Sequence, residues 1–132
     1  MHGSKYRNIK TTIDGITFDS VKESDRYTYL NLLKRAGEIT SIEHHKKYVL
    51  LESFTNAQGV HRSPISYTPD FIVTRNDGSI YAEDVKGSEE IITDLFSIKR
   101  KLFEKRYPEI ELKVYIHKNK QWVELTKKKR RG

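Results

Sequence analysis

The sequence predicts a single α/β domain with a mixed central sheet flanked by helices, covering residues 1–126 and followed by a basic tail at 127–132. Its 132 residues suffice for one hydrophobic core but not for two separate cores. Helical and strand patterns follow one another along the chain in the order α-β-β-β-α-β. Because a helix separates the last two strands of this series, we expect those strands to run parallel in an otherwise antiparallel sheet.

The first elements are a hairpin and a helix. Asp14 and Gly15 are typical of the tight turn of a small hairpin, here over residues 13–18. Ser20 is a good N-cap for a helix that extends to about residue 36, and Gly37 is a good terminator. The apolar residues of this helix predict a buried face with the following members: Val21, Tyr29, Leu32, Leu33 and Ala36.

Strands, one long loop and a second helix make up the rest of the chain. The polar, glycine-containing stretch 53–63 predicts a loop. The second helix covers about residues 90–106 and ends before Pro108. Its apolar stripe contains Ile91, Ile92, Leu95, Phe96, Leu102 and Phe103. Strands are expected at 47–52, 65–74, 79–86, 110–116 and 122–125.

The charge of the protein is unevenly distributed. The chain contains 25 Lys and Arg against 18 Asp and Glu, and the resulting net charge of +7 favours a polyanionic partner such as nucleic acid. Residues 95–132 hold 13 of the basic and 4 of the acidic side chains, so the positive excess lies in the last third of the chain. The run that begins at Lys127, Lys128 and Lys129 should be disordered when free, and either contacts phosphates or acts as a solubilising tail.

Composition also excludes several classes of protein. The chain has no cysteine, which excludes disulfides, thiolate zinc sites and cysteine nucleophiles. It has no apolar run long enough to span a membrane and no secretory signal, so we expect a soluble, cytoplasmic protein with no membrane partner. The internal histidines lack metal-ligand spacing, and the sequence assigns no chemistry to them: His44, His45, His61 and His117.

The strongest chemical signal lies in the strands predicted at 65–74 and 79–86. A three-residue loop that ends in glycine joins them and pairs Arg75 with Ser79. Counting back from this pair places Asp70 opposite Asp84, and the two-residue period of a strand places Lys86 on the same face. Facing carboxylates destabilise a sheet unless something compensates for their charge, and Mg²⁺ is the usual compensation. If the register is shifted by one residue, both acids are instead solvated strand ends.

Each helix contributes one further candidate. Glu23 follows Ser20 by three residues and fits a capping box, in which its carboxylate only satisfies a backbone N–H. Lys99 falls within the apolar stripe of the second helix, where its stem packs and its ammonium group either escapes to solvent or points at an acidic site or a phosphate. Arg100 and Lys101 lie on the outer side of that helix as solvated charges.

Pro69-Asp70, the hairpin and Asp84-Val85-Lys86 follow one another in the order Pro-Asp…(Asp/Glu)-x-Lys. This order resembles the signature of the PD-(D/E)XK nuclease superfamily. Four further segments resemble small phage-type endonuclease-like proteins of that superfamily, long grouped as a domain of unknown function: Phe18-Asp19-Ser20-Val21-Lys22-Glu23, Arg26-Tyr27, Glu83-Asp84-Val85-Lys86-Gly87 and Lys99-Arg100-Lys101-Leu102-Phe103. The resemblance spans about residues 13–116 and implies a restriction-endonuclease-like αβββαβ core.

The resemblance implies a role for each residue that matches the signature. Asp70 and Asp84 match the acids that bind the metal, and Val85 would offer its backbone carbonyl to the same Mg²⁺ or Mn²⁺ ion. Lys86 matches the lysine that positions or helps to deprotonate the attacking water. Glu23 matches the acid of the first helix, which completes the catalytic site directly or through water.

The resemblance also implies where DNA would bind. Lys99 matches a basic position of the second helix near the active site. Together with it, we expect these residues to contact DNA: Arg26, Lys101, Lys127, Lys128 and Lys129.

On these grounds we expect a Mg²⁺-dependent DNA endonuclease, encoded by a phage or prophage, that acts on branched or flap-like phage DNA in the bacterial cytoplasm. Holliday-junction resolution would be one specific case and would require a homodimer with two sites. Two alternatives stay open: a non-catalytic DNA-binding module with a nuclease-like fold, and an interaction factor whose basic face binds an acidic host protein. Salt dependence and competition by duplex DNA would separate the last of these from nucleic-acid binding.

Overall fold

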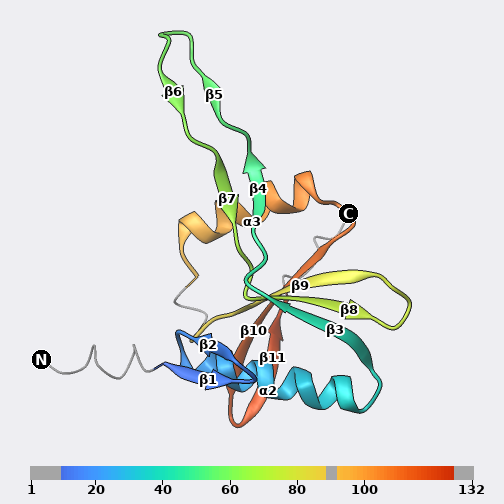
Figure 1. The fold of residues 1–132 in the computed structure, drawn as a ribbon. Helices are drawn as coiled ribbons and strands as arrows, with labels where there is room; N and C mark the ends of the chain where they lie inside the picture. Colours follow the sequence, from blue (N-terminus) through green and yellow to red (C-terminus); the bar gives the residue numbers. More distant parts are fainter. Residues whose placement is uncertain (1–9, 89–91, 127–132) are drawn as a thin grey trace, which may run out of the picture.

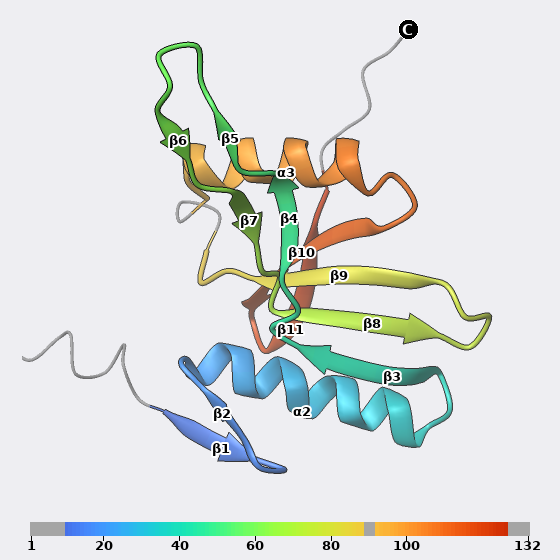
Figure 2. The same ribbon diagram turned by 45° about the horizontal axis from the view of Figure 1, so that its top comes forward.

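A mixed sheet between two helices forms the body of the protein in the computed structural model, which describes residues 10–88 and 92–126 (Figures 1 and 2). The helices are α2 (Val21–Arg35) and α3 (Asp94–Arg106). The strands are β1 (Thr11–Ile13), β2 (Ile16–Phe18), β3 (Ile39–His44), β4 (Tyr48–Leu51), β5 (Phe54–Thr55), β6 (His61–Arg62), β7 (Ile65–Tyr67), β8 (Phe71–Arg75), β9 (Ile80–Val85), β10 (Glu111–Lys118) and β11 (Gln121–Leu125). Neither helix of the described residues is long and apolar enough to cross a membrane.

The main sheet has the strand order β11-β10-β9-β8-β3. Its neighbouring strands are antiparallel except for β9 and β10, which run parallel. These two strands precede and follow α3 in the chain, and the order of elements predicted their parallel direction. Helix α2 and the β1–β2 hairpin cover one face, and α3 covers the other (Figure 2). The predicted α/β class with a mixed central sheet is therefore confirmed.

The first strand of the main sheet is not the one that the sequence predicted. Residues 47–52 contain β4, which pairs with β7 outside the main sheet, and β3 occupies the edge next to β8 instead. Most side chains of β3 are exposed or half-buried, because it is an edge strand with α2 on only one side. Its sequence therefore lacks the apolar alternation by which a strand is recognised.

The stretch predicted as a loop, 53–63, is the outer part of a projecting arm. Strands β5 and β6 pair there, and β4 and β7 form the base of the arm, which extends away from the sheet in Figure 1. The strand predicted at 65–74 is consequently divided, because β7 belongs to the arm and β8 to the sheet. The division falls at residues 68–70 and includes Pro69, which has no N–H for a sheet ladder.

Apolar residues pack on both faces of the sheet. The cluster on the α2 side includes Phe18, Tyr27, Leu30, Phe71 and Val73, and the cluster on the α3 side includes Tyr67, Ile72, Phe96, Phe103 and Val114.

The buried residues of α2 differ from those predicted, whereas those of α3 are part of the predicted stripe. In α2 the buried positions are Glu23, Ser24, Arg26, Tyr27 and Leu30, whereas four members of the predicted face are exposed: Val21, Tyr29, Leu32 and Ala36. In α3 the buried residues are Phe96 and Phe103, while Leu95 and Leu102 are exposed. Helix α3 begins at Asp94 with Thr93 as its N-cap; residues 89–91, where its start was predicted, and the tail at 127–132 lie outside the described residues.

Candidate functional site

The β8–β9 hairpin brings two carboxylates together. Its register pairs Phe71 with Glu83 and Thr74 with Ile80, as counted from the turn, so Asp70 and Asp84 follow as the next opposed pair. The Asp70 N–H donates to Asp84 Oδ1 at 3.2 Å, and the Val85 N–H donates to Asp70 Oδ2 at 2.8 Å. The predicted juxtaposition of the two acids is therefore present, and the alternative of a register shifted by one residue is wrong.

Tyr67 contributes a contact that the sequence did not reveal. Its hydroxyl donates to Asp84 Oδ2 at 2.6 Å from the end of β7, and the side chain is buried against Phe96 and Phe103. Burial, the Asp84 charge and this hydrogen bond raise the pKa of Tyr67, so the phenol keeps its proton and remains a donor. Tyr67 thus holds one oxygen of Asp84 in place at the base of the arm.

The two acids share a poorly hydrated environment. Asp84 is 5% exposed, and desolvation together with the Asp84 charge raises the pKa of Asp70 to about 9. In the metal-free protein Asp70 is therefore protonated at neutral pH. A cation bound in place of this proton would stabilise the ionised form of Asp70 against desolvation and against repulsion from Asp84.

Lys86 and Lys99 lie in the same pocket as the acids. The ammonium nitrogen of Lys86 is 3.5 Å from Asp84 Oδ2 and 4.1 Å from the centre of the Phe96 ring. An open pocket of about 530 Å³ is lined by Asp70, Asp84, Lys86 and, from α3, Lys99. The pocket thus combines a carboxylate pair with two cationic side chains and is open to solvent.

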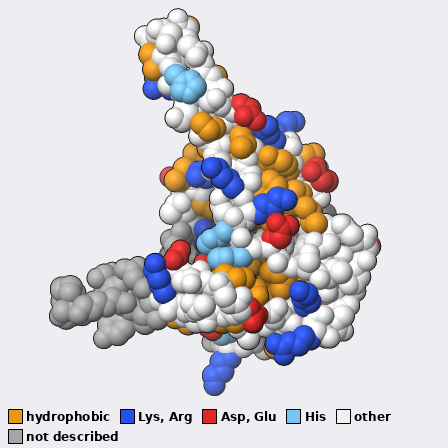
Figure 3. All heavy atoms as spheres, viewed as in Figure 1, with side chains coloured by type: hydrophobic (Ala, Val, Ile, Leu, Met, Phe, Trp, Pro, Cys, Tyr) orange, Lys and Arg blue, Asp and Glu red, His pale blue; other side chains and the backbone are white. Residues whose placement is uncertain are grey.

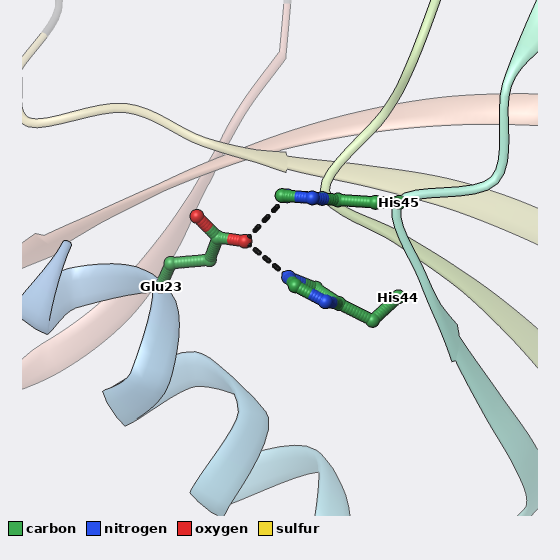
Figure 4. Close-up of side chains that lie close together, drawn as sticks. All are labelled: Glu23, His44 and His45. Carbon is green, nitrogen blue, oxygen red and sulfur yellow. Dashed lines mark hydrogen bonds and ion pairs between the residues drawn. The ribbon is translucent and has the colours of Figure 1, made fainter. Parts of the chain in front are cut away.

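Glu23, on α2, contacts two histidines, and one of them lies near Asp70. Its Oε2 atom is 2.6 Å from His44 Nε2 and 2.8 Å from His45 Nε2, as Figure 4 shows. His45 Nε2 is also 4.0 Å from Asp70 Oδ1. Ser20 caps α2 by accepting the Glu23 N–H, as predicted, but the Glu23 carboxylate bonds to the histidines.

The assignment of Arg26 to DNA binding is corrected by the structure. Arg26 is 3% exposed, and its guanidinium forms two hydrogen bonds of 2.7 Å to the carboxylate of Glu83 on the α2 side of the sheet. Burial lowers the pKa of Arg26, but the Glu83 carboxylate outweighs burial and the pKa is raised overall. The side chain also stacks on the Tyr115 ring, so no part of it is free to meet a phosphate.

The remaining predicted contacts differ in accessibility. Lys101 is exposed on the outer side of α3, as predicted, whereas Lys99 is half-buried beside the acids. Lys127, Lys128 and Lys129 lie outside the described residues.

Three contributors to the site were missed from the sequence: Tyr67, His44 and His45. The break between β7 and β8 turns Tyr67 toward Asp84, and the spacing of Tyr67 from Asp70 does not reveal that break. For the histidines the one available signal was that they are adjacent in the sequence.

The chain was compared with known proteins. A search of curated proteins finds no match. Residues 3–123 match the family described as "Protein of unknown function (DUF1064)". Because this match covers most of the chain, the protein belongs to the DUF1064 family.

Proposed function

We propose that the protein is a metal-dependent DNA endonuclease with a restriction-endonuclease-like core. The observation that carries this proposal is the pair of facing acids, Asp70 and Asp84, with the Lys86 ammonium 3.5 Å from Asp84 in an open pocket. The order of the elements around the main sheet gives further support: helix α2, the antiparallel strands β3, β8 and β9, helix α3, and then the parallel strand β10. This is the αβββαβ order of the nuclease superfamily that the sequence resembles.

The donor atoms at the pocket suit a hard divalent cation. The Asp70 and Asp84 carboxylates and the Val85 carbonyl are oxygen donors, which Mg²⁺ and Mn²⁺ prefer. Burial and then the neighbouring Asp84 charge raise the pKa of Asp70, and a bound cation would favour the ionised form of this carboxyl group. When bound, Mg²⁺ supplies Lewis-acid polarisation of the phosphoryl oxygens and neutralises charge on the leaving oxygen.

Lys86 would act on the substrate rather than on the metal, since an ammonium group is not a ligand. Its position beside Asp84 and against the Phe96 ring fixes the charge at the rim of the pocket. There it would orient the attacking water and stabilise the negative charge that develops on the phosphate in the transition state. Glu23 is separated from Asp70 by His45, and we assign it an indirect role in this reaction.

DNA would approach across the base of the arm and the first half of α3. Lys99 lines the pocket and Lys101 is exposed on the same helix. Residues 53–69 of the chain, which make up most of the arm, contain no Asp or Glu. A surface without acidic groups beside two lysines is compatible with a phosphate backbone.

The proposal is tested by incubating single-stranded, duplex, flap and four-way DNA with the protein in Mg²⁺, Mn²⁺ or EDTA. Asp84→Asn should abolish cleavage and weaken metal binding while DNA binding in EDTA persists, because one negative charge near the phosphates is lost. Lys86→Ala should keep the metal and slow cleavage by about 10²–10³-fold.

The chain offers matched controls for both variants. Lys113 is 22% exposed and 3.6 Å from Glu124, which matches the 21% exposure of Lys86 and its 3.5 Å separation from Asp84. Because Lys113 does not line the pocket, Lys113→Ala should cleave normally. Asp77→Asn alters a carboxylate at the far end of the same hairpin and should also be active. If no substrate is cut and Asp84→Asn binds metal normally, the enzyme is excluded and a DNA-binding module or a protein-interaction factor remains.

A further inference from the structure

We propose that Glu23, His44 and His45 form a binding site for a divalent first-row transition-metal cation, separate from the Asp70–Asp84 pair. One atom from each residue converges in this cluster, with Glu23 Oε2 2.6 Å from His44 Nε2 and 2.8 Å from His45 Nε2. All three ligand atoms lie within 4.8 Å of one another. Figure 4 shows both rings turned toward the same carboxylate oxygen.

The backbone of His45 is what brings the two rings together. Successive side chains of an extended strand point to opposite faces, so neighbouring histidines normally diverge. His45 follows β3 with a φ of +60°, a left-handed conformation that is uncommon outside glycine but is adopted by histidine more often than by most residues. As a result the His44 and His45 rings stack with their centres 3.7 Å apart. The left-handed turn at His45 thus brings three potential ligands together at the end of β3.

The distances between the ligand atoms are close to those required by a metal. With metal–nitrogen bonds of about 2.1 Å, ligand atoms at right angles to one another are about 3.0 Å apart. The separations of 2.6 Å and 2.8 Å would have to widen by a few tenths of an ångström for ligands at right angles, and by about 0.6–0.8 Å for the tetrahedral geometry that Zn²⁺ prefers.

The chemistry of the ligands selects the class of cation. Two imidazoles and one carboxylate suit Zn²⁺, Fe²⁺ and related ions, whereas Mg²⁺ prefers oxygen ligands alone. Glu23 and His44 are largely buried, but His45 is 40% exposed, which leaves the site accessible from solvent. Histidine side chains reach the surface in the middle of the face shown in Figure 3, below the arm. A cation held by these residues would therefore retain open positions for water or for an anionic ligand.

The site can be tested in a chain that lacks the acid pair as a competing metal site. Co²⁺ serves as the probe, because its visible absorption reports on imidazole ligation, and equilibrium dialysis counts the bound ions. Asp84→Asn should bind one Co²⁺ per chain, and a roughly 100-fold excess of Mg²⁺ should not displace it. Adding His45→Asn should weaken Co²⁺ binding by more than the roughly 10–100-fold typical of a lost outer-shell partner, and should change the visible absorption because one of the two imidazole ligands is lost.

His45→Asn is chosen because asparagine tolerates the left-handed backbone at this position. Adding Glu23→Gln to Asp84→Asn provides a second, nearly isosteric variant, and it should weaken Co²⁺ binding in the same way. His61→Asn, which removes an exposed imidazole on β6, is the matched control and should leave Co²⁺ binding unchanged.

Two outcomes would overturn the site. One is an Asp84→Asn protein that binds no Co²⁺, and the other is a Co²⁺ spectrum and affinity that survive the loss of His45. DNA cleavage does not enter this test, so its result is independent of the nuclease proposal.

Discussion

Asp70 illustrates how the fold changes the chemistry of one side chain. Its pKa is about 9 in the folded, metal-free protein because of desolvation and the neighbouring Asp84, compared with 3.8 as the ordinary value. Between these two pH values the folded state binds one proton more than the unfolded state. The free energy of unfolding therefore falls as the pH rises from about 4 to 9.

Asp70→Asn should remove this pH-dependent loss of stability. Asparagine is uncharged throughout the range, so the variant should melt at a higher temperature than the wild type at pH 8 in EDTA, with a smaller difference at pH 5. Thermal unfolding followed by circular dichroism at both pH values measures the effect. An equal shift at the two pH values would show that ionisation of Asp70 is not its cause.

Asp77 is a control whose pKa is shifted in the opposite direction from that of Asp70. Hydrogen bonds from the hydroxyl and the N–H of Ser79 lower the pKa of this exposed carboxyl group, so its contribution to stability is present above the ordinary pKa and is lost in acid. Asp77→Asn should therefore lower the melting temperature slightly at pH 8, where Asp70→Asn raises it.

At the scale of elements, the Arg26–Glu83 ion pair joins α2 to the centre of the sheet. Glu83 is fully buried, and its Oε2 also accepts a hydrogen bond from the Tyr81 hydroxyl. Burial followed by the Glu83 charge raises the pKa of Tyr115, on the neighbouring strand, to about 12, so this phenol stays neutral. The pair faces away from Asp84, and its role is to position β9 against α2.

Breaking this pair should be costly, whereas replacing both partners should not. Arg26→Met or Glu83→Leu alone leaves a buried charge without its partner, and each should lower the free energy of unfolding by about 3–5 kcal/mol. The double variant should be close to the wild type, because two apolar side chains avoid the desolvation of both charges.

Urea denaturation of the four proteins gives the coupling energy between Arg26 and Glu83 as a double-mutant cycle. The exposed pair Arg75–Glu111, 2.9 Å apart, is the control and should show a coupling below about 1 kcal/mol. Additive losses in the cycle of the buried pair would contradict the assigned role.

At the scale of the whole molecule, the arm formed by β4, β5, β6 and β7 projects from the sheet (Figure 1). Its base supplies Ser66, Tyr67 and Thr68 to the pocket, and its outer part carries Arg62. If DNA binds at this pocket, as we propose, the arm is placed to contact it.

Replacement of residues 53–63 by an Asn-Gly turn should weaken DNA binding while β4 and β7 stay paired. Loss of the Arg62 charge should reduce the slope of log affinity against log salt by about 0.9, and Arg62→Ala in the intact arm should reproduce that change. Fluorescence anisotropy at several salt concentrations measures both quantities. An unchanged affinity and slope would exclude the arm from the interface.

The sequence by itself determined the features that depend on neighbouring residues. The glycine-ended turn at 76–78 set the register of β8 and β9, and the two-residue period of a strand then placed Asp70, Asp84 and Lys86 on one face. The helix between β9 and β10 likewise required these strands to be parallel. Both inferences rest on local geometry, because a short hairpin loop allows few strand registers and a crossover helix allows few strand arrangements.

Only the tertiary structure decided the features that depend on contacts between distant segments. The buried face of α2 is polar because Glu23 meets histidines and Arg26 meets Glu83, so hydrophobic periodicity indicated the wrong face. Sequence patterns likewise did not reveal β3, which is an exposed edge strand, or the role of Tyr67. The interruption between β7 and β8 turns Tyr67 toward Asp84. In each case the free energy that positions the residue comes from partners far away in the sequence, and a pattern of neighbouring residues carries no information about them.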